Sequence, residues 1–282
     1  MSRRPLPPAG VPLPRNQGRT SEITSLTNDT IKAVRALHMK KARDQSGTFL
    51  AEGLKFIGEA LDLGQTPRQL LVGKDARPHP LLDRARAETL AAGGEVIVVT
   101  REILEKVSRK DNPQTVLAVF DQTYTALDAL DPGRSPCWVA LEQVRDPGNL
   151  GTIIRTADAA GCGGVILIDD CVDPFSVEAV RATMGSIFAV SVSRATRAEF
   201  LAWRARWPGS VVGTRLDAAH DYRAAPYRHP TLILMGNEQA GLTDDLAAAC
   251  DLTVKIPMRG RADSLNLAIA TGIMVYAATE GI

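Results

Sequence analysis

Six short apolar runs in the second half of the chain constrain its fold more than any other feature. These candidate strands are Cys137–Leu141, Val165–Ile168, Ile187–Val192, Ser210–Thr214, Thr231–Met235 and Leu252–Ile256. The runs are continuously apolar instead of alternating, which is typical of strands covered on both faces in a parallel sheet. Helical patterns separate them, and Leu265–Ala278 predicts a long apolar helix at the end. The predicted fold class is therefore α/β, with a parallel-sheet domain over residues 137–282.

The first half of the chain shows a smaller alternation of helices and strands. One basic helix is predicted from Ile31 to Met39, and further helices around 54–61 and 81–90. The strand candidates between them are Phe49–Ala51, Gln69–Val72, Val96–Thr100 and Thr115–Phe120. Residues 23–120 are thus expected to form a small α/β domain. Asp121 to Pro136 is polar and rich in turn residues, and is the predicted linker.

Residues 1–22 are expected to be a disordered, basic, proline-rich tail. The first 20 residues hold five prolines, four arginines and no acid, and cannot bury enough apolar surface to order themselves. No apolar stretch follows the arginines, which excludes a secretory signal, and the prolines disfavour the helix of a transit peptide. Residues 1–44 carry nine Lys and Arg against three acids, although the net charge of the chain is only +1. This block suits either a polyanion partner or a solvated tail.

The cysteines and the apolar runs restrict the cellular setting. Cys137, Cys162, Cys171 and Cys250 are scattered, with no C-x-x-C pair and no histidine cluster nearby. This pattern argues against structural zinc, against any other metal site and against a disulfide framework, and it favours the cytoplasm. No apolar run reaches the ~20 residues that a membrane span needs, so no membrane partner is expected.

A polar turn follows the first strand of the second domain. Asp146-Pro147-Gly148-Asn149 precedes a helical pattern that contains Arg155. Proline and glycine favour the turn, and Asp or Asn suits a helix N-cap. By itself the segment predicts only a capped strand-to-helix connection with a surface arginine.

A second loop comes directly after the strand that ends at Met235. Gly236 and Gly241 bracket Glu238 in this loop. Glycines let a ligand approach the backbone closely, and ligands of open α/β sheets bind beyond the carboxyl ends of the strands. A plain turn into the next helix explains the same residues when they are taken alone.

A third loop joins the last strand to the last helix. It runs from Ile256-Pro257-Met258 to Ser264-Leu265-Asn266. Ser264 and Asn266 are ordinary cap residues for a following helix, so this loop is also weak evidence by itself.

In this order, the three loops resemble the signature motifs of SpoU/TrmH-type RNA methyltransferases of the SPOUT superfamily. The motifs are Asn149-x-Gly151-x-x-x-Arg155, Gly236-x-Glu238-x-x-Gly241, and Ile256-Pro257-Met258 with Ser264-Leu265-Asn266. Phe49-Leu50-Ala51-Glu52-Gly53 and Asn112-Pro113-Gln114-Thr115 resemble the accessory substrate-binding domain of the family. Three ordered motifs are far more specific than any one of them.

The resemblance implies a fold, a cofactor and a set of site residues. The family holds S-adenosylmethionine in the loops of a deep trefoil knot, a threading that general folding rules do not predict. Its members are homodimers with RNA sites built across the interface. The implied cofactor contacts are Met235, Gly236, Gly241, Ile256, Pro257, Met258 and Leu265. The implied catalytic residues are Arg155, Asn149, Glu238, Ser264 and Asn266.

The implied reaction methylates a ribose 2′-OH, and Arg155 is the position of the family's candidate base. An arginine with a pKa above about 12 does not normally accept a proton at neutral pH. We therefore expect Arg155 mainly to bind the target phosphate and to stabilise a developing alkoxide. Asn149 and Glu238 would orient Arg155 or the ribose, and Ser264 and Asn266 would shape the site.

Two other functions stay open at this stage, and so does the target RNA. One alternative is a catalytically silent RNA-binding homologue, against which the intact set of five polar residues argues. The other is a nucleotide-dependent α/β enzyme such as a dehydrogenase, but no strand is followed by the glycine fingerprint G-x-G-x-x-G. The accessory domain favours large-subunit rRNA over tRNA, by analogy with the family alone.

Overall fold

The computed structural model describes residues 18–280, which divide into two compact units. The first unit comprises the chain up to Thr123 and the later segment Phe175–Phe188. The second unit comprises Tyr124–Pro174 and the chain from Ala189 onward. No helix among the described residues is long and apolar enough to cross a membrane.

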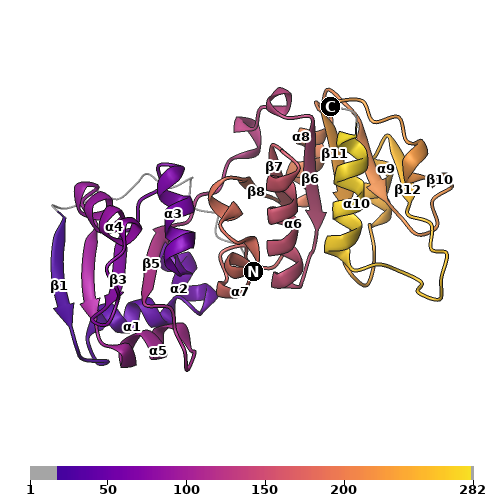
Figure 1. The fold of residues 1–282 in the computed structure, drawn as a ribbon. Coiled ribbons are helices and arrows are strands. Elements are labelled where there is room, and N and C mark those ends of the chain that lie inside the picture. Colours follow the sequence, from indigo (N-terminus) through magenta and orange to yellow (C-terminus); the bar gives the residue numbers. More distant parts are fainter. Residues whose placement is uncertain (1–17, 281–282) are drawn as a thin grey trace, which may run out of the picture. The chain divides into compact units, whose positions relative to one another are not determined.

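The first unit is built on a mixed sheet of five strands in the order β1-β4-β3-β5-β2 (Figure 1). Its strands are β1 (Arg19–Ile23), β2 (Thr48–Glu52), β3 (Gln69–Gly73), β4 (Glu95–Val99) and β5 (Val116–Asp121). Its helices are α1 (Asp29–Ala36), α2 (Lys40–Ser46), α3 (Leu54–Asp62), α4 (Pro80–Ala91), α5 (Arg101–Ser108) and α7 (Val177–Thr183). β1, β4 and β3 are parallel, and β5 runs antiparallel to both β3 and β2.

Helices cover both faces of this sheet, which is why its strands are apolar on both sides. α1 and α5 lie on one face, where Ile31, Val34 and Ile103 pack on Leu71 and Ile97. α3 and α4 pack together on the other side (Figure 1). The predicted strands and the predicted helices 54–61 and 81–90 are confirmed within one or two residues.

Two sequence expectations for this unit are wrong. The single helix predicted from Ile31 to Met39 is two helices, because α1 ends at Ala36 and Met39 has an extended backbone before α2. Met39 is therefore 61% exposed instead of joining the apolar face. The disordered tail predicted over residues 1–22 is wrong at its end, since Arg19–Ile23 forms β1 and pairs with Glu95–Val99 of β4. Residues 1–17 of that predicted tail lie outside the described residues.

The chain contributes a late segment to the first unit before it resumes the second. Phe175 and Phe188 of this segment lie 4.9 and 5.9 Å from the ring of Phe49, and Phe188 also lies 4.8 Å from Phe120. The strand predicted over Ile187–Val192 is accordingly wrong at its start. Ser186–Phe188 is the 3-10 helix η3, and β8 begins only at Ser191. Burial of Phe188 among aromatic rings produced the apolar signal that predicted a strand.

The second unit contains an all-parallel sheet of seven strands in the order β10-β12-β9-β11-β6-β7-β8. Its strands are β6 (Cys137–Glu142), β7 (Gly164–Ile168), β8 (Ser191–Ala195), β9 (Val211–Thr214), β10 (His220–Asp221), β11 (Thr231–Met235) and β12 (Leu252–Lys255). Its helices are α6 (Pro147–Ala159), α8 (Arg197–Arg204), α9 (Asp244–Ala248) and α10 (Leu267–Thr279). Three 3-10 helices complete the described part of this unit: η1 (Leu127–Ala129), η2 (Pro132–Arg134) and η4 (Tyr222–Ala224). The predicted parallel sheet is confirmed.

Helices on both faces of the second sheet explain its continuously apolar strands. Trp138, Ile166 and Leu232 point to the face where Phe200 of α8 and Leu246 of α9 pack. On the other face, α6 and α10 pack against each other and against neighbouring strands (Figure 1). β11 lies beside β6 in parallel, with Met235 level with Leu141. The loops that leave these two strands therefore start next to each other.

Candidate active site

The predicted turn before α6 is a capped helix start. Asp146 is the N-cap, and its carboxylate accepts a hydrogen bond of 2.6 Å from the backbone N–H of Asn149. Pro147 occupies the first helical position, where its missing N–H costs nothing. The cap thereby fixes the position of Asn149 in the first turn of α6, next to the end of the sheet where β6 terminates.

Glu238 reaches this turn from the loop after β11. Its carboxylate accepts hydrogen bonds from the backbone N–H of Arg145 at 3.2 Å and of Asp146 at 3.3 Å. It also accepts one of 3.3 Å from Nδ2 of Asn149. A carboxylate suits this position because the N–H groups before a helix start carry partial positive charge.

Asn266 completes the contact from the third loop. Its Nδ2 donates a hydrogen bond of 2.8 Å to Oδ1 of Asn149. Its own Oδ1 caps α10 by accepting from the N–H of Ala268 at 2.9 Å and of Ile269 at 3.3 Å. The structure thus brings Glu238, Asn149 and Asn266 into one hydrogen-bonded path, and both ends of the Asn149 amide are used.

Tight backbone contacts hold the glycine loop in shape. A Cβ added to Gly236 would lie 2.1 Å from the carbonyl carbon of Gly241 and from the nitrogen of Leu242. Asn237 and Gly241 exchange backbone hydrogen bonds of 3.0 and 2.9 Å, and Gly241 has a φ of 69°. The side chain of Asn237, which the motif analysis had not singled out, donates a 2.8 Å hydrogen bond to the carbonyl of Gln143. Only glycine fits at position 236, and the positive φ at position 241 favours glycine there as well.

Two of the predicted catalytic residues stand apart from this path. Arg155 lies on α6 with an exposed side chain, and its guanidinium forms no hydrogen bond or ion pair within residues 18–280. Six residues separate it from Asn149, which on an α-helix is about 120° of rotation and about 9 Å along the axis. Ser264 is exposed and its hydroxyl donates to Asp263 at 3.3 Å.

The predicted cofactor residues lie on the same three loops. Met235 is buried at the end of β11, and Ile256, Pro257 and Met258 are half-buried after β12. Leu265 is exposed beside Asn266. Within the described part of the chain, residues 257–265 make no backbone hydrogen bond to other backbone groups. Their C=O groups, and their N–H groups at every position but Pro257, are therefore available to a ligand.

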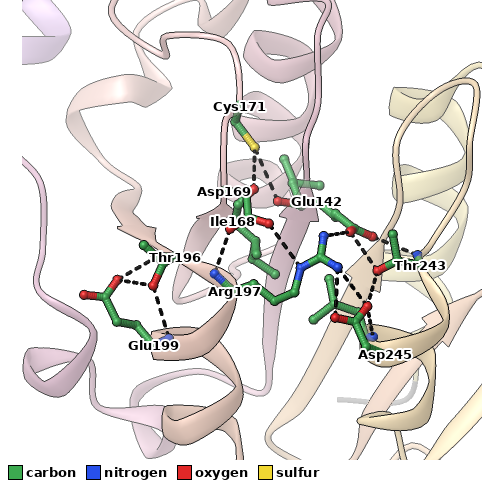
Figure 2. A network of polar contacts seen from close by, with 11 residues as sticks. Glu142, Ile168, Asp169, Cys171, Thr196, Arg197, Glu199, Thr243 and Asp245 are labelled. Carbon is green, nitrogen blue, oxygen red and sulfur yellow. Dashed lines mark hydrogen bonds and ion pairs between the residues drawn. The ribbon is translucent and has the colours of Figure 1, made fainter. Parts of the chain in front are cut away.

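A second polar network is centred on Arg197 and includes Thr243, which follows the glycine loop in the chain (Figure 2). Its guanidinium donates to Glu142 at 2.6 Å, to Asp169 at 3.1 Å and to Asp245 at 2.9 Å. The Glu142 carboxylate, 1% exposed, also accepts from the N–H of Thr243 at 2.9 Å. The network thus ties the ends of β6 and β7 to the segment that follows Gly241.

These contacts shift the ionisation of two members of the network. Hydrogen bonds from Thr243 and Arg197 lower the pKa of Asp245 to about 2. The hydrogen bond with Asp245, and the nearby Glu142 and Asp169 carboxylates, raise the pKa of Arg197. Sequence reasoning missed this network, because Arg197 and Glu142 are 55 residues apart. The one available signal was a carboxylate at the end of a fully apolar strand.

One protein-family profile covers the part of the chain that contains all three loops. The profile of the SpoU rRNA Methylase family matches residues 136–276, which contain all of the site residues described above. The chain belongs to the SpoU rRNA methylase family. Residues 28–118 match the MRM3-like substrate binding domain, so the accessory domain inferred from the sequence is confirmed.

Relatives of this SpoU methylase have stated activities on rRNA. The 23S rRNA (guanosine(2553)-2'-O)-methyltransferase of Bacillus subtilis is 32% identical, over 90% of this chain and 98% of its own. The 23S rRNA (uridine(2479)-2'-O)-methyltransferase of Streptomyces viridochromogenes is 32% identical, over 86% of this chain and 85% of its own. The AdoMet-bound rRNA methyltransferase of Sinorhizobium meliloti matches with a TM-score of 0.86 and 48% identity, over 92% of this chain and 97% of its own.

Proposed function

We propose that this protein uses S-adenosylmethionine to methylate a ribose 2′-OH of 23S rRNA. The observation that carries the proposal is the hydrogen-bonded path from Glu238 through Asn149 to Asn266. It joins one residue from each of the three motifs at the carboxyl ends of the strands, where ligands of open parallel sheets bind. The relatives from Bacillus subtilis and Streptomyces viridochromogenes are both 23S rRNA 2'-O-methyltransferases.

The loops fit S-adenosylmethionine, which supplies a methyl group on a sulfonium. Adenine and the methionine moiety both form hydrogen bonds with backbone groups. The backbone of residues 257–265 is free for such bonds, because it forms none with other backbone groups of the described chain. Met235 and Gly236 would contact the cofactor from β11 and Gly241 from the same loop, while Ile256, Pro257, Met258 and Leu265 would enclose it. The S. meliloti rRNA methyltransferase, with the same fold, is AdoMet-bound.

Arg155 is proposed to bind the RNA phosphate and to stabilise negative charge on the ribose oxygen. A guanidinium without a protein partner is free to form the paired hydrogen bonds that phosphates accept. Asn149, Glu238 and Asn266 hold the loops in register, and Ser264 would meet the ribose or the cofactor from the third loop. Alignment of this kind contributes several kcal/mol to group transfer.

The proposal extends to the path of the chain in the second unit. We infer that the segment after β12 is threaded into the deep trefoil knot of this family. In support, Asn266 bonds to Asn149, 117 residues earlier in the chain. We further propose that the first unit, which begins with β1 at Arg19 and includes Phe175–Phe188, binds RNA, and that the second unit is the methyltransferase domain. These units replace the bounds 23–120, 121–136 and 137–282 expected from the sequence, because Tyr124 already belongs to the second unit.

We propose a homodimer that forms through α6 and α10. Ile269 and Tyr276 of α10 are 57% and 56% exposed, an unusual apolar surface for a helix at the site. Arg155 lies on α6 away from Asn149 of the same copy. In the proposed dimer, Arg155 of the second copy would reach the path formed by Glu238, Asn149 and Asn266. The four cysteines are free thiols, which is consistent with the reducing cytoplasm as the proposed location.

Methyl transfer from labelled S-adenosylmethionine to purified RNA tests the function. We expect label in 23S rRNA at one ribose, lost in an Arg155→Lys variant that keeps the charge but not the forked geometry. Label in tRNA alone would redirect the proposal to another substrate. RNA binding without any transfer would indicate a silent homologue. Near-normal turnover and unchanged RNA affinity in Arg155→Lys would refute the phosphate role.

A further inference from the structure

A groove of about 560 Å³ lies in the first unit between the helices α1 and α5, far along the sequence from the methyltransferase motifs. Its lining combines five cations with two carboxylates and one exposed apolar side chain. The lining residues are Lys32, Arg35, Ala36, Met39, Glu105, Lys106, Arg109, Lys110 and Asp111. A concave surface with this charge suits a polyanion.

Three of these cations have no partner of opposite charge within residues 18–280. Lys32 pairs with Asp29 at 2.9 Å and Lys110 with Glu52 at 2.7 Å. The remaining three, Arg35, Lys106 and Arg109, form no ion pair with any described residue of the chain. Arg35 and Lys106 stand in the last turns of α1 and α5, where the helix dipole favours a cation. Helix electrostatics therefore favour a cation at these two positions and at Arg109, the C-cap of α5, but they do not explain the backbone conformation of Arg109.

Arg109 occupies a backbone conformation that disfavours it. It caps α5 with a φ of 55° and a ψ of 38°, the left-handed region in which glycine is the usual C-terminal residue. A side chain at this position strains the backbone, so local folding preferences select against arginine here.

The start of α2 also departs from the usual helix preferences, because it carries cations where acids and a capping side chain are favoured. Lys40 and Lys41 are exposed in its first turn, which contains no acid, and Met39 provides no side-chain cap. Cations at the start of a helix meet the positive end of its dipole and weaken the helix. Departures from local preference of this kind are expected at functional or strained sites.

We propose that this basic groove binds the phosphate backbone of the rRNA substrate, with Arg35, Lys106 and Arg109 as its main contacts. Lys40 and Lys41 extend the same charge beside it, and the exposed thioether of Met39 offers an apolar contact for a sugar or base. The inference rests on the proposed function, because it names the surface by which the accessory domain holds that substrate.

Arg109→Gly separates binding from folding. The substitution removes a charge and relieves the left-handed strain, so we expect an unchanged or raised Tm together with weaker RNA binding. A structural role for Arg109 predicts the opposite, a lower Tm. The matched control is Arg84→Gln on α4, which removes one equal charge from a helix that packs on α3 instead of lining the groove.

The quantitative test compares the wild type with the triple variant Arg35→Gln, Lys106→Gln, Arg109→Gly on in vitro-transcribed 23S rRNA. Each lost phosphate contact lowers the slope of log affinity against log salt by about 0.9 on a duplex. Three lost contacts thus lower it by about 2.7, so the affinity advantage of the wild type falls roughly 40-fold between about 50 and 200 mM salt. The Arg84→Gln slope should match the wild type.

The outcomes separate this inference from the proposed function. If the wild type methylates 23S rRNA but the triple variant keeps its affinity and slope, the groove is not the RNA surface and the function stands. If the wild type transfers no methyl group while the triple variant loses the slope, the groove stands and the function fails. Equal losses in the triple variant and Arg84→Gln would show a general charge effect and overturn the inference.

Discussion

The exchange of Asn149 for aspartate probes the hydrogen-bonded path most directly. The substitution keeps the oxygen that accepts from Asn266 and replaces the donor that faces Glu238. A carboxylate oxygen would then lie about where Nδ2 lies, 3.3 Å from an oxygen of Glu238. The substitution therefore changes only the contact with Glu238, where it replaces a neutral amide donor by a negatively charged carboxylate.

The cost follows from the exposure of the site. Two charges about 4 Å apart repel by about 1 kcal/mol in water and about 4 kcal/mol at an effective dielectric constant near 20. Glu238 is exposed, so we take about 1–2 kcal/mol for the repulsion and about 1 kcal/mol for the lost hydrogen bond. The total, about 2–3 kcal/mol, corresponds to roughly 30- to 150-fold in methyl-transfer rate if the loops must be joined for turnover.

A double-mutant cycle with Glu238→Gln makes this result specific. A glutamine at position 238 can turn its amide nitrogen toward the new carboxylate at position 149 and still accept from the backbone N–H of Arg145 through its oxygen. It gives up the hydrogen bond from the N–H of Asp146, which the oxygen facing position 149 accepts in the wild type, and the Glu238→Gln single variant in the cycle accounts for that loss. We expect the double variant to regain about 1–2 kcal/mol relative to Asn149→Asp, because the repulsion is removed. The assays are thermal unfolding and single-turnover transfer from S-adenosylmethionine. A double variant that is no better than Asn149→Asp in either assay would refute the coupling of the two loops.

Two further predictions concern the glycine loop and the network centred on Arg197. Gly236→Ala should abolish transfer and lower Tm, because its Cβ would lie 2.1 Å from the backbone at Gly241. Gly133→Ala is the control, because it is exposed, lies outside the three loops and would place its Cβ no closer than 3.4 Å to another atom; equal effects of the two substitutions would contradict the argument. Asp245 has a pKa of about 2, below its ordinary value of 3.8, so its contribution to stability is complete above about pH 4 and is lost as the pH falls through 2. Asp245→Asn should therefore flatten the fall of unfolding free energy between about pH 4 and 2, and an unchanged slope would show that the contacts with Thr243 and Arg197 do not persist in solution.

Local patterns in the sequence predicted most of the elements and some details of the site. The strands at Thr231–Met235 and Cys137–Leu141 were predictable because strands buried on both faces must be apolar throughout. The cap by Asp146 was predictable because its hydrogen bond spans three residues. The same reasoning failed at Ile187–Val192, because burial of Phe188 among aromatic rings gives the same apolar signal as a strand.

The sequence by itself thus determined the parallel sheet, the cap of α6 and the glycines that turn the loop after β11. These depend on backbone angles and burial, which neighbouring residues set. Only the tertiary structure decided that Asn149 meets Glu238, 89 residues later, and Asn266, 117 residues later. It likewise joined Arg197 to Glu142, and it left Arg155 without a partner among the described residues. Such contacts depend on the order of strands in the sheet and on the path of the chain between them, and spacing along the sequence does not encode either.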